Sequence, residues 1–358
     1  MGSEMCIRDS STSGSGYLQD ILQVSVGYWH TCALKSDGSR VYCWGRNNYG
    51  QLGDNNSPTD SDIPVEVVST SGSGNLTDIS QVSAGYYHTC ALKSDGSRVY
   101  CWGANFQGQL GDNSYPTNSD IPVEVVSTSG SGYLQDILRV SGGFWRACAI
   151  KSDGSRVYCW GDNSSGQLGD NNYPEDSYIP TEVVSFLDLG YLSDISQIVA
   201  GGANTCALKS DGSRLYCWGY NNYGQVGNNH SGTFSEIPQE VVSPSGSGVL
   251  SDISQVSVGG YHVCALKSDG TRVYCWGWNP YGQLGDNSTT SSDIPVEVVS
   301  TSGSGNLQDI SQVSAGYGHT CAIKSDGSRV YCWGYNNNGE LGDNSTTNSA
   351  IPVEVVST

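Results

Sequence analysis

The chain has 358 residues and a formal net charge of −19, from 16 basic and 35 acidic side chains. An excess of negative charge repels phosphate backbones and anionic lipid, so nucleic acid and membrane surfaces are not expected partners. No run of 18 or more apolar residues occurs, and the sequence therefore predicts no membrane-spanning helix.

The first ten residues do not match the sequence that follows them. Residues 5–10 (MCIRDS) resemble the translated adapter sequence found at the ends of metagenomic gene predictions. We therefore expect residues 1–10 to be a non-native leader and exclude them from the fold. On this interpretation, the native N-terminus and any signal peptide lie outside the sequence.

A block of about 58 residues then recurs six times, at 11–68, 69–126, 127–184, 185–242, 243–299 and 300–358. Its core in the first copy, residues 30–45, reads HTCALKSDGSRVYCWG. A fixed period of this length predicts a repeat architecture, in which each unit buries its faces against its neighbours. We therefore expect residues 11–358 to form a single domain.

The block predicts four strands. An apolar strand over 21–26 precedes two strand-like runs, 31–35 and 40–44, which flank Asp37-Gly38. Asp-Gly at this place predicts a β-hairpin, because a type I′ turn needs positive φ at both central residues. A Gly/Asn-rich loop over 47–55 leads to a fourth strand over 63–68.

The hairpin also predicts which residues face each other. Folding about Asp37-Gly38 pairs Cys32 with Cys43 and leaves both faces of the sheet largely apolar. Two apolar faces are typical of a blade packed between two others. The predicted fold is therefore all-β: a β-propeller of six four-stranded blades.

Twelve of the thirteen cysteines form six pairs with ten residues between their members. Opposed positions on paired strands lie within disulfide range, so we predict six cross-strand disulfides, which would imply an oxidising compartment. The alternative is six pairs of buried free thiols. The paired residues are Cys32 and Cys43, Cys90 and Cys101, Cys148 and Cys159, Cys206 and Cys217, Cys264 and Cys275, and Cys321 and Cys332.

The histidine before each first cysteine raises the alternative of a metal site, because His30, Cys32 and Cys43 could supply three zinc ligands. Arg146 and Asn204 replace that histidine in the third and fourth copies, which keep their cysteine pairs. We therefore expect no metal and no cofactor, and interpret the histidines as structural hydrogen-bonding residues.

The Gly/Asn loop raises a second alternative. Asp54-Asn55 and its copies could suggest calcium, but one Asp per loop is few for a cation that takes six to eight oxygens. We interpret these residues as turn formers, with bound calcium as the alternative.

The blocks HTCALKSDG, VYCWG and GQLG resemble the repeat of the regulator of chromosome condensation family in all six copies, with Val226 and Glu340 as variants of the third block. The resemblance implies a propeller, usually of seven blades, so an incomplete propeller of seven is the alternative to a six-bladed one. In that family, nucleotide exchange on a small nuclear GTPase is tied to a wedge-like insertion and a basic tail. Repeats of 57 or 58 residues leave no room for a wedge here, and no basic tail is present, so we do not expect that activity. The bacterial, cysteine-bearing branch is more similar. The family also resembles a bacterial inhibitor protein of β-lactamases, which binds another protein through a propeller face.

The copies differ mainly in aromatic content, at the two positions before the histidine and in the Gly/Asn loop. Exposed aromatic residues are typical anchors of binding surfaces. The alternative is that these aromatic side chains only fill space between the blades. The candidate binding face comprises Trp29, Tyr87, Trp145, Arg146, Tyr261, Tyr49, Phe106, Tyr223, Trp278 and Tyr281.

No Ser-His-Asp arrangement or carboxylate pair stands out, so we do not predict an enzyme. The favoured function is a non-catalytic binding scaffold, extracellular, periplasmic or on the cell surface, that recognises a protein or glycan through one propeller face. We expect a monomer or a module of a larger surface protein. The alternatives are a regulator of a small GTPase, a propeller enzyme acting on glycans, and a structural spacer.

Overall fold

The structure is a computed structural model that describes residues 17–186 and 190–356; the expected leader, 1–10, lies outside this range. In the described residues, 24 strands form six four-stranded antiparallel sheets, or blades. The predicted fold class is confirmed: the chain is all-β and has the four-stranded blades of a β-propeller.

The blades fall into two compact units. Unit 1 comprises the described residues up to Ser164 together with Pro174–Val183, and unit 2 comprises Ser165–Tyr173 together with the described residues from Val184 onward. The expectation of a single domain over 11–358 stays a prediction.

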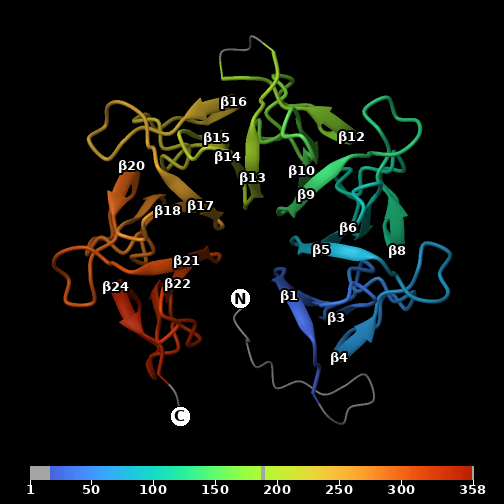
Figure 1. Ribbon diagram of the computed structural model, residues 1–358, viewed down its shortest axis with the longest axis horizontal. Helices are drawn as coiled ribbons and strands as arrows, with labels where there is room; N and C mark the ends of the chain where they lie inside the picture. Colours follow the sequence, from blue (N-terminus) through green and yellow to red (C-terminus); the bar gives the residue numbers. More distant parts are fainter. Residues whose placement is uncertain (1–16, 187–189, 357–358) are drawn as a thin grey trace. The chain divides into compact units, whose positions relative to one another are not determined.

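Unit 1 holds blades 1 to 3, drawn from blue to green in Figure 1. Blade 1 is β1 (Ile21–Val26), β2 (His30–Lys35), β3 (Val41–Gly45) and β4 (Ser61–Glu66). Blade 2 is β5 (Ile79–Ala84), β6 (His88–Lys93), β7 (Val99–Gly103) and β8 (Ser119–Glu124). Blade 3 is β9 (Ile137–Gly142), β10 (Arg146–Lys151), β11 (Val157–Gly161) and β12 (Ser177–Glu182).

Unit 2 holds blades 4 to 6, drawn from yellow-green to red. Blade 4 is β13 (Ile195–Ala200), β14 (Asn204–Lys209), β15 (Leu215–Tyr220) and β16 (Phe234–Glu240). Blade 5 is β17 (Ile253–Val258), β18 (His262–Lys267), β19 (Val273–Gly277) and β20 (Ser292–Glu297). Blade 6 is β21 (Ile310–Ala315), β22 (His319–Lys324), β23 (Val330–Gly334) and β24 (Ser349–Glu354).

The register of the central hairpin is the one the sequence predicts. In blade 1, β2 and β3 pair antiparallel with Cys32 opposite Cys43. These two residues are joined by a disulfide, with their Cα atoms 4.1 Å apart. The same cross-strand bond occurs in every blade, and the prediction of six disulfides is confirmed; the other five are Cys90–Cys101, Cys148–Cys159, Cys206–Cys217, Cys264–Cys275 and Cys321–Cys332.

Each blade has two different apolar faces. We call the face that carries Cys32, Leu34, Val41 and Cys43 in blade 1 the cysteine face, and the opposite face, with Trp44 and its neighbours, the tryptophan face. In unit 1, the cysteine face of blade 1 packs on the tryptophan face of blade 2 and forms a buried core. Burial of this apolar surface holds one blade against the next.

Polar contacts fix the register between blades 1 and 2. The main-chain carbonyl of Gln51, in the Gly/Asn loop of blade 1, accepts hydrogen bonds from Trp102 Nε1 and Thr89 Oγ1, both at 3.0 Å. The Gln23 side chain makes two bonds to the main chain of Val82, at 3.0 Å each. All these groups lie at the blade interface, where an unpaired polar group would be costly.

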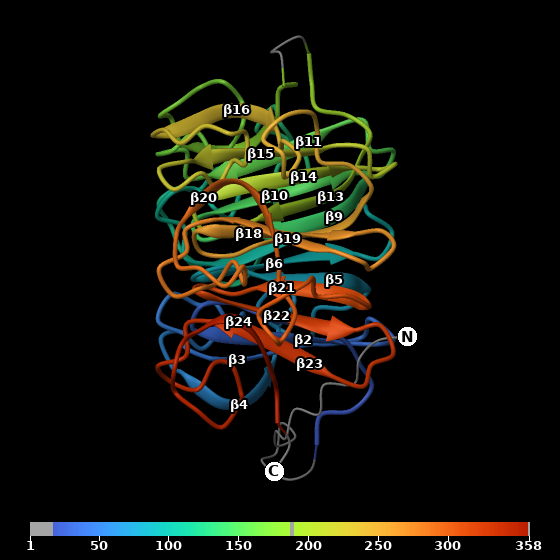
Figure 2. The ribbon, with the colours of Figure 1, turned by 90° about the vertical axis from the view of Figure 1, so that its left-hand side faces the viewer.

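Unit 2 repeats this arrangement between blades 5 and 6, whose strands lie side by side in Figure 2. The Gln283 carbonyl accepts from Trp333 Nε1 at 2.9 Å and from Thr320 Oγ1 at 3.0 Å. Val313 N donates to the Gln255 side chain at 2.9 Å. The same inter-blade contact therefore recurs in both units.

The histidines belong to the same interfaces. His30 Nε2 lies 2.8 Å from Thr89 Oγ1, and His262 Nε2 lies 2.8 Å from Thr320 Oγ1. The predicted structural hydrogen bond is confirmed for these two residues. His88 lacks a hydroxyl partner of this kind because Ala147 occupies the corresponding position. Burial lowers the pKa of His30 to about 4.

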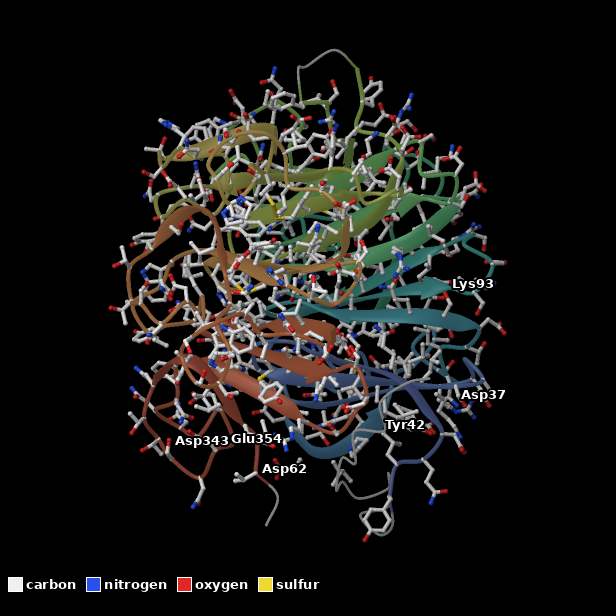
Figure 3. The ribbon with its side chains drawn as sticks, turned by 60° about the vertical axis from the view of Figure 1, so that its left-hand side comes forward. Asp37, Tyr42, Asp62, Lys93, Asp343 and Glu354 are labelled. Carbon is white, nitrogen blue, oxygen red and sulfur yellow. A yellow bond between two sulfur atoms is a disulfide. The ribbon has the colours of Figure 1, made fainter. Side chains whose placement is uncertain are left out.

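The hairpin tips are polar and partly ion-paired. Arg98 Nε lies 3.3 Å from Glu124, and Lys209 Nζ lies 3.1 Å from Asp194. Figure 3 shows Asp37 and Lys93, from the tips of blades 1 and 2, on the same side of the molecule. In the described part of the chain, no helical segment has the length and hydropathy needed to cross a bilayer.

Candidate functional site

The predicted binding residues lie at the end of the blades opposite the hairpin tips. In an antiparallel sheet of order β1-β2-β3-β4, the β1–β2 and β3–β4 connections share one end, and the β2–β3 hairpin lies at the other. Trp29 lies in the β1–β2 connection and Tyr49 in the β3–β4 connection. We call this end the aromatic end of each blade.

Eight aromatic rings lie in mutual contact at the aromatic end of unit 1. They come from three consecutive blades and are spaced close to the repeat length. We call them the unit 1 cluster: Tyr28, Trp29, Tyr49, Tyr86, Tyr87, Phe106, Phe144 and Trp145.

The residues directly after the first strands form the first layer of this cluster. Tyr28 and Tyr86 are stacked, with ring centroids 4.2 Å apart and an interplanar angle of 16°. Phe144 continues the series, 4.9 Å from Tyr86. Burial, together with the neighbouring Tyr28 and Tyr87, raises the pKa of Tyr86 above its usual value, so the phenol stays neutral at physiological pH.

The next residue of each blade forms a second layer. Trp29 Nε1 donates to Tyr87 Oη at 3.1 Å, and Tyr87 lies 5.4 Å from Trp145 between ring centroids. Tyr49 joins this layer to Phe106, with centroids 4.9 Å apart. Aromatic pairs at these distances contribute beyond simple area burial, so the rings are held in defined positions.

A cationic side chain also lies on this layer. The Arg46 guanidinium sits 4.8 Å from the centroid of the Trp29 ring. Trp29 nevertheless remains 46% exposed, while Trp102 in the blade interface is fully buried. The structure therefore separates two kinds of tryptophan: one that holds blades together and one that faces solvent at the aromatic end.

Unit 2 carries a second aromatic group at the corresponding end of its own blades. Its rings are linked by edge-to-face or tilted contacts, such as Tyr261 to Trp278 at 5.8 Å and Trp278 to Tyr281 at 5.3 Å. Blade 4 contributes less because Gly202 and Ala203 replace its aromatic pair. We call this group the unit 2 cluster: Tyr220, Tyr223, Tyr261, Trp278, Tyr281, Tyr317 and Tyr335.

The predicted face is thus brought together as two clusters, one in each unit. Trp29, Tyr49, Tyr87, Phe106 and Trp145 belong to the unit 1 cluster, and the four predicted residues from blades 4 and 5 belong to the unit 2 cluster.

Arg146 differs from the rest of the predicted face. Its side chain is fully buried, and burial lowers its pKa to about 10 while the nearby Asp162 carboxylate opposes that shift. It is therefore an internal charge of blade 3 and not an exposed contact.

Sequence reasoning left several members out. Tyr28, Tyr86 and Phe144 precede predicted residues by one position. Arg46 directly follows the recurring Trp-Gly, and only blade 1 has a cation there. Aromatic character at repeat spacing is the available signal for Tyr28, Tyr86 and Phe144, and no repeat marks Arg46. Only the structure places Arg46 over Trp29.

The described residues include no group of three or more His, Cys, Asp or Glu side chains placed to hold a metal ion. In the Gly/Asn loop of blade 1, Asp54 Oδ1 accepts from Asn47 Nδ2 at 3.0 Å and from Asn56 N at 3.3 Å. These contacts are those of the predicted turn chemistry.

Comparison with known proteins places the chain among propellers of one type. A family model described as an RCC1-like domain matches residues 8–358. The Ultraviolet-B receptor UVR8 of Arabidopsis thaliana is 33% identical over 336 residues, which cover 94% of this chain and 70% of that protein. The probable E3 ubiquitin-protein ligase HERC4 of Homo sapiens is 32% identical; the match covers 88% of this chain and only 32% of that protein.

Two solved structures share the fold. Human WBSCR16 aligns with a TM-score of 0.78 and 23% identity, over 96% of this chain and 83% of that one. Prp20p of Saccharomyces cerevisiae aligns with a TM-score of 0.76 and 23% identity, over 94% of this chain and 77% of that one.

Proposed function

This chain belongs to the RCC1-like domain family, and from that premise we propose that it is a non-catalytic scaffold that binds another protein through its aromatic end. The observation that carries the proposal is the unit 1 cluster, in which ordered rings stay partly exposed at one end of otherwise well-packed blades. Tryptophan, tyrosine and arginine are the residue types that dominate binding energy at protein interfaces.

The chemistry of this surface supports binding over catalysis. Rings already held by neighbouring rings lose little conformational entropy when a partner covers them. Trp29, with Arg46 on its ring and its Nε1 bonded to Tyr87, presents such a preorganised anchor. The relatives give support by analogy: the Prp20p structure is described with its binding to Gsp1p and histones. A regulator of a small GTPase stays the alternative among protein-binding functions.

We further propose that the scaffold is secreted or displayed at the cell surface. Six disulfides support this location, because such bonds persist in oxidising compartments and are rare in the cytosol. A glycan is the alternative ligand, since exposed aromatic rings also suit the apolar faces of sugars.

The test compares two exposed aromatic residues of unit 1 that each carry an arginine. Trp29 lies at the aromatic end under Arg46, and Tyr133 lies at the opposite end with Arg98 4.1 Å from its centroid. Ligands are first selected with the oxidised protein from a displayed library of extracellular domains and from a glycan array. Their dissociation constants are then measured for wild type, Trp29→Ala and Tyr133→Ala.

We expect a protein ligand whose affinity falls about 30-fold or more in Trp29→Ala, as for an interfacial anchor worth about 2 kcal/mol, and stays unchanged in Tyr133→Ala. A glycan ligand with the same variant profile would keep the aromatic end as the site and change the ligand class. Ligands unaffected by Trp29→Ala would contradict the proposal.

A further inference from the structure

The aromatic end of unit 1 carries mostly negative charge. In the described residues of this unit, the connections after β3, β7 and β11 bear one cation, Arg46, and six carboxylates: Asp54, Asp60, Asp112, Asp162, Glu175 and Asp176. The hairpin tips at the other end hold six cations, and ion pairs such as Arg40 with Glu66 at 3.5 Å and Arg98 with Glu124 at 3.3 Å offset their charge. The two ends of these blades therefore differ in charge.

In blade 1, a cation and a carboxylate adjoin the exposed tryptophan of the unit 1 cluster. Arg46 N donates to the Trp29 carbonyl at 2.9 Å, and Asn47 N, from the next residue, donates to Asp60 Oδ1 at 2.7 Å. The Arg46 guanidinium lies over the Trp29 ring, 4.8 Å from its centroid. A ring of this layer thus takes a flat cation on its face, where the π-electrons attract positive charge.

Blade 3 repeats this arrangement with an acidic residue in place of the arginine. Asp162 N donates to the Trp145 carbonyl at 3.0 Å, and Asn163 N donates to Asp176 Oδ1 at 2.8 Å. In the described residues, no cation of this chain lies over the Trp145 ring, which is partly exposed. Trp145 therefore has the position of Trp29 in its blade, with carboxylates beside it where blade 1 has a guanidinium.

The carboxylates beside Trp145 repel one another. Burial raises the pKa of Asp176, the hydrogen bond from Asn163 opposes this rise, and the neighbouring Asp162 and Glu175 carboxylates add to it. The buried Arg146 interacts with Asp162 and offsets part of its charge. Asp176 is half-buried and Glu175 is exposed, so a cation from outside the chain that pairs with them would relieve the repulsion.

We propose that the protein partner of the aromatic end presents a basic segment, and that an arginine or lysine of this segment lies on the Trp145 ring and pairs with Asp176. This inference rests on the proposed function and adds the charge of the partner to it. The ring face and the carboxylate both favour a cation over a neutral or acidic group. The net charge of −19 also attracts a basic partner before contact.

Blade 2 supplies the variant for the test. Its Asn118 has the position of Asp176, and Asn118 Oδ1 accepts from Asn105 N at 2.8 Å. Asp176→Asn therefore removes one charge and keeps the hydrogen bond that holds the loop. Asp153→Asn is the matched control, because it removes one charge at the hairpin tip of the same blade and keeps the acceptor oxygen of the turn. Circular dichroism verifies the fold of each variant.

The probe is a phage-displayed library of short random peptides, selected on the oxidised full chain. Peptides whose binding is lost in Trp29→Ala are ligands of the aromatic end. The tightest of them is synthesised with its own sequence and in a neutral form, with citrulline for arginine and acetyl-lysine for lysine. Dissociation constants are measured for wild type, Asp176→Asn and Asp153→Asn at physiological ionic strength, where charges more than about 8 Å apart are largely screened.

We expect the Trp29-dependent peptides to be rich in arginine or lysine. Asp176→Asn should weaken the tightest peptide about threefold to fivefold, as for a partly exposed ion pair, and Asp153→Asn should leave its affinity unchanged. The neutral form of the peptide should lose less affinity in Asp176→Asn than in wild type, because the two charges act as a pair.

Two results would overturn this inference and leave the proposed function standing: Trp29-dependent peptides without basic residues, or equal affinities in Asp176→Asn and Asp153→Asn. A selection in which no peptide depends on Trp29 would overturn both.

Discussion

Acid should loosen the interface between blades 1 and 2 through His30. The ring is buried with Nε2 2.8 Å from Thr89 Oγ1, and burial lowers its pKa to about 4, from 6.5 in an exposed chain. Between these values the unfolded chain binds a proton at this ring and the folded chain does not. The stability that depends on the neutral ring is therefore complete above pH 6.5 and is lost as the pH falls toward 4.

The size of the effect follows from the shift. A difference of 2.5 pH units at about 1.4 kcal/mol per unit corresponds to about 3 kcal/mol at this site. The variant His30→Asn removes the titrating group with a side chain that blade 4 already buries at the same position, as Asn204. Between pH 7 and pH 4, wild type should lose about 3 kcal/mol more unfolding free energy than His30→Asn.

The assay is urea unfolding with the disulfides intact, followed by tryptophan fluorescence at several pH values. His230→Asn, on an exposed loop residue, is the control and should follow the wild-type curve. Parallel pH profiles for wild type and His30→Asn would contradict this prediction, because they would show that the ring is solvated or protonated in the folded protein.

Two further predictions compare equivalent positions in different blades. Trp102→Ala should lower the free energy of unfolding in urea by about 3–5 kcal/mol, because it empties a fully buried site and removes the hydrogen bond to the Gln51 carbonyl. Trp44→Ala should lower it clearly less, because Trp44 is half-buried. Equal losses in the two variants would contradict the description of the blade interface. Gly50 and Gly339 have similar positive φ angles, 86° and 84°, so alanine should strain both positions alike. An added Cβ at Gly50 would also collide with Asp120 of the next blade, whereas one at Gly339 would meet nothing within 4 Å. The melting temperature should therefore fall further for Gly50→Ala than for Gly339→Ala.

The sequence was sufficient for the features that depend on neighbouring residues. Asp37-Gly38 fixes the hairpin, the hairpin fixes the pairing of Cys32 with Cys43, and that pairing places both sulfurs within bonding range. Because the block recurs, the same cysteine pairing forms in every blade. Local turn chemistry and strand alternation decide this part of the structure, and both can be read from a short stretch of sequence.

Contacts across one whole repeat could not be predicted in the same way. The sequence of the Gly/Asn loop predicts a turn, yet the Gln51 carbonyl within it accepts the hydrogen bonds of Trp102 and Thr89 from the next blade. Which aromatic rings touch, and that Arg146 is internal, depends on how close two blades approach. That distance is set by the packing of two whole blade faces, and the sequence of one repeat does not determine it.

We propose that this chain is a disulfide-bonded binding scaffold of an oxidising compartment, and the state of its cysteines tests this proposal most directly. The unfolded protein, prepared under oxidising conditions, is alkylated with and without prior reduction, and its intact mass is measured. We expect twelve additional labels after reduction, two for each of the six disulfides. Labelling of all thirteen cysteines without reduction would contradict it and would move the chain into a reducing compartment.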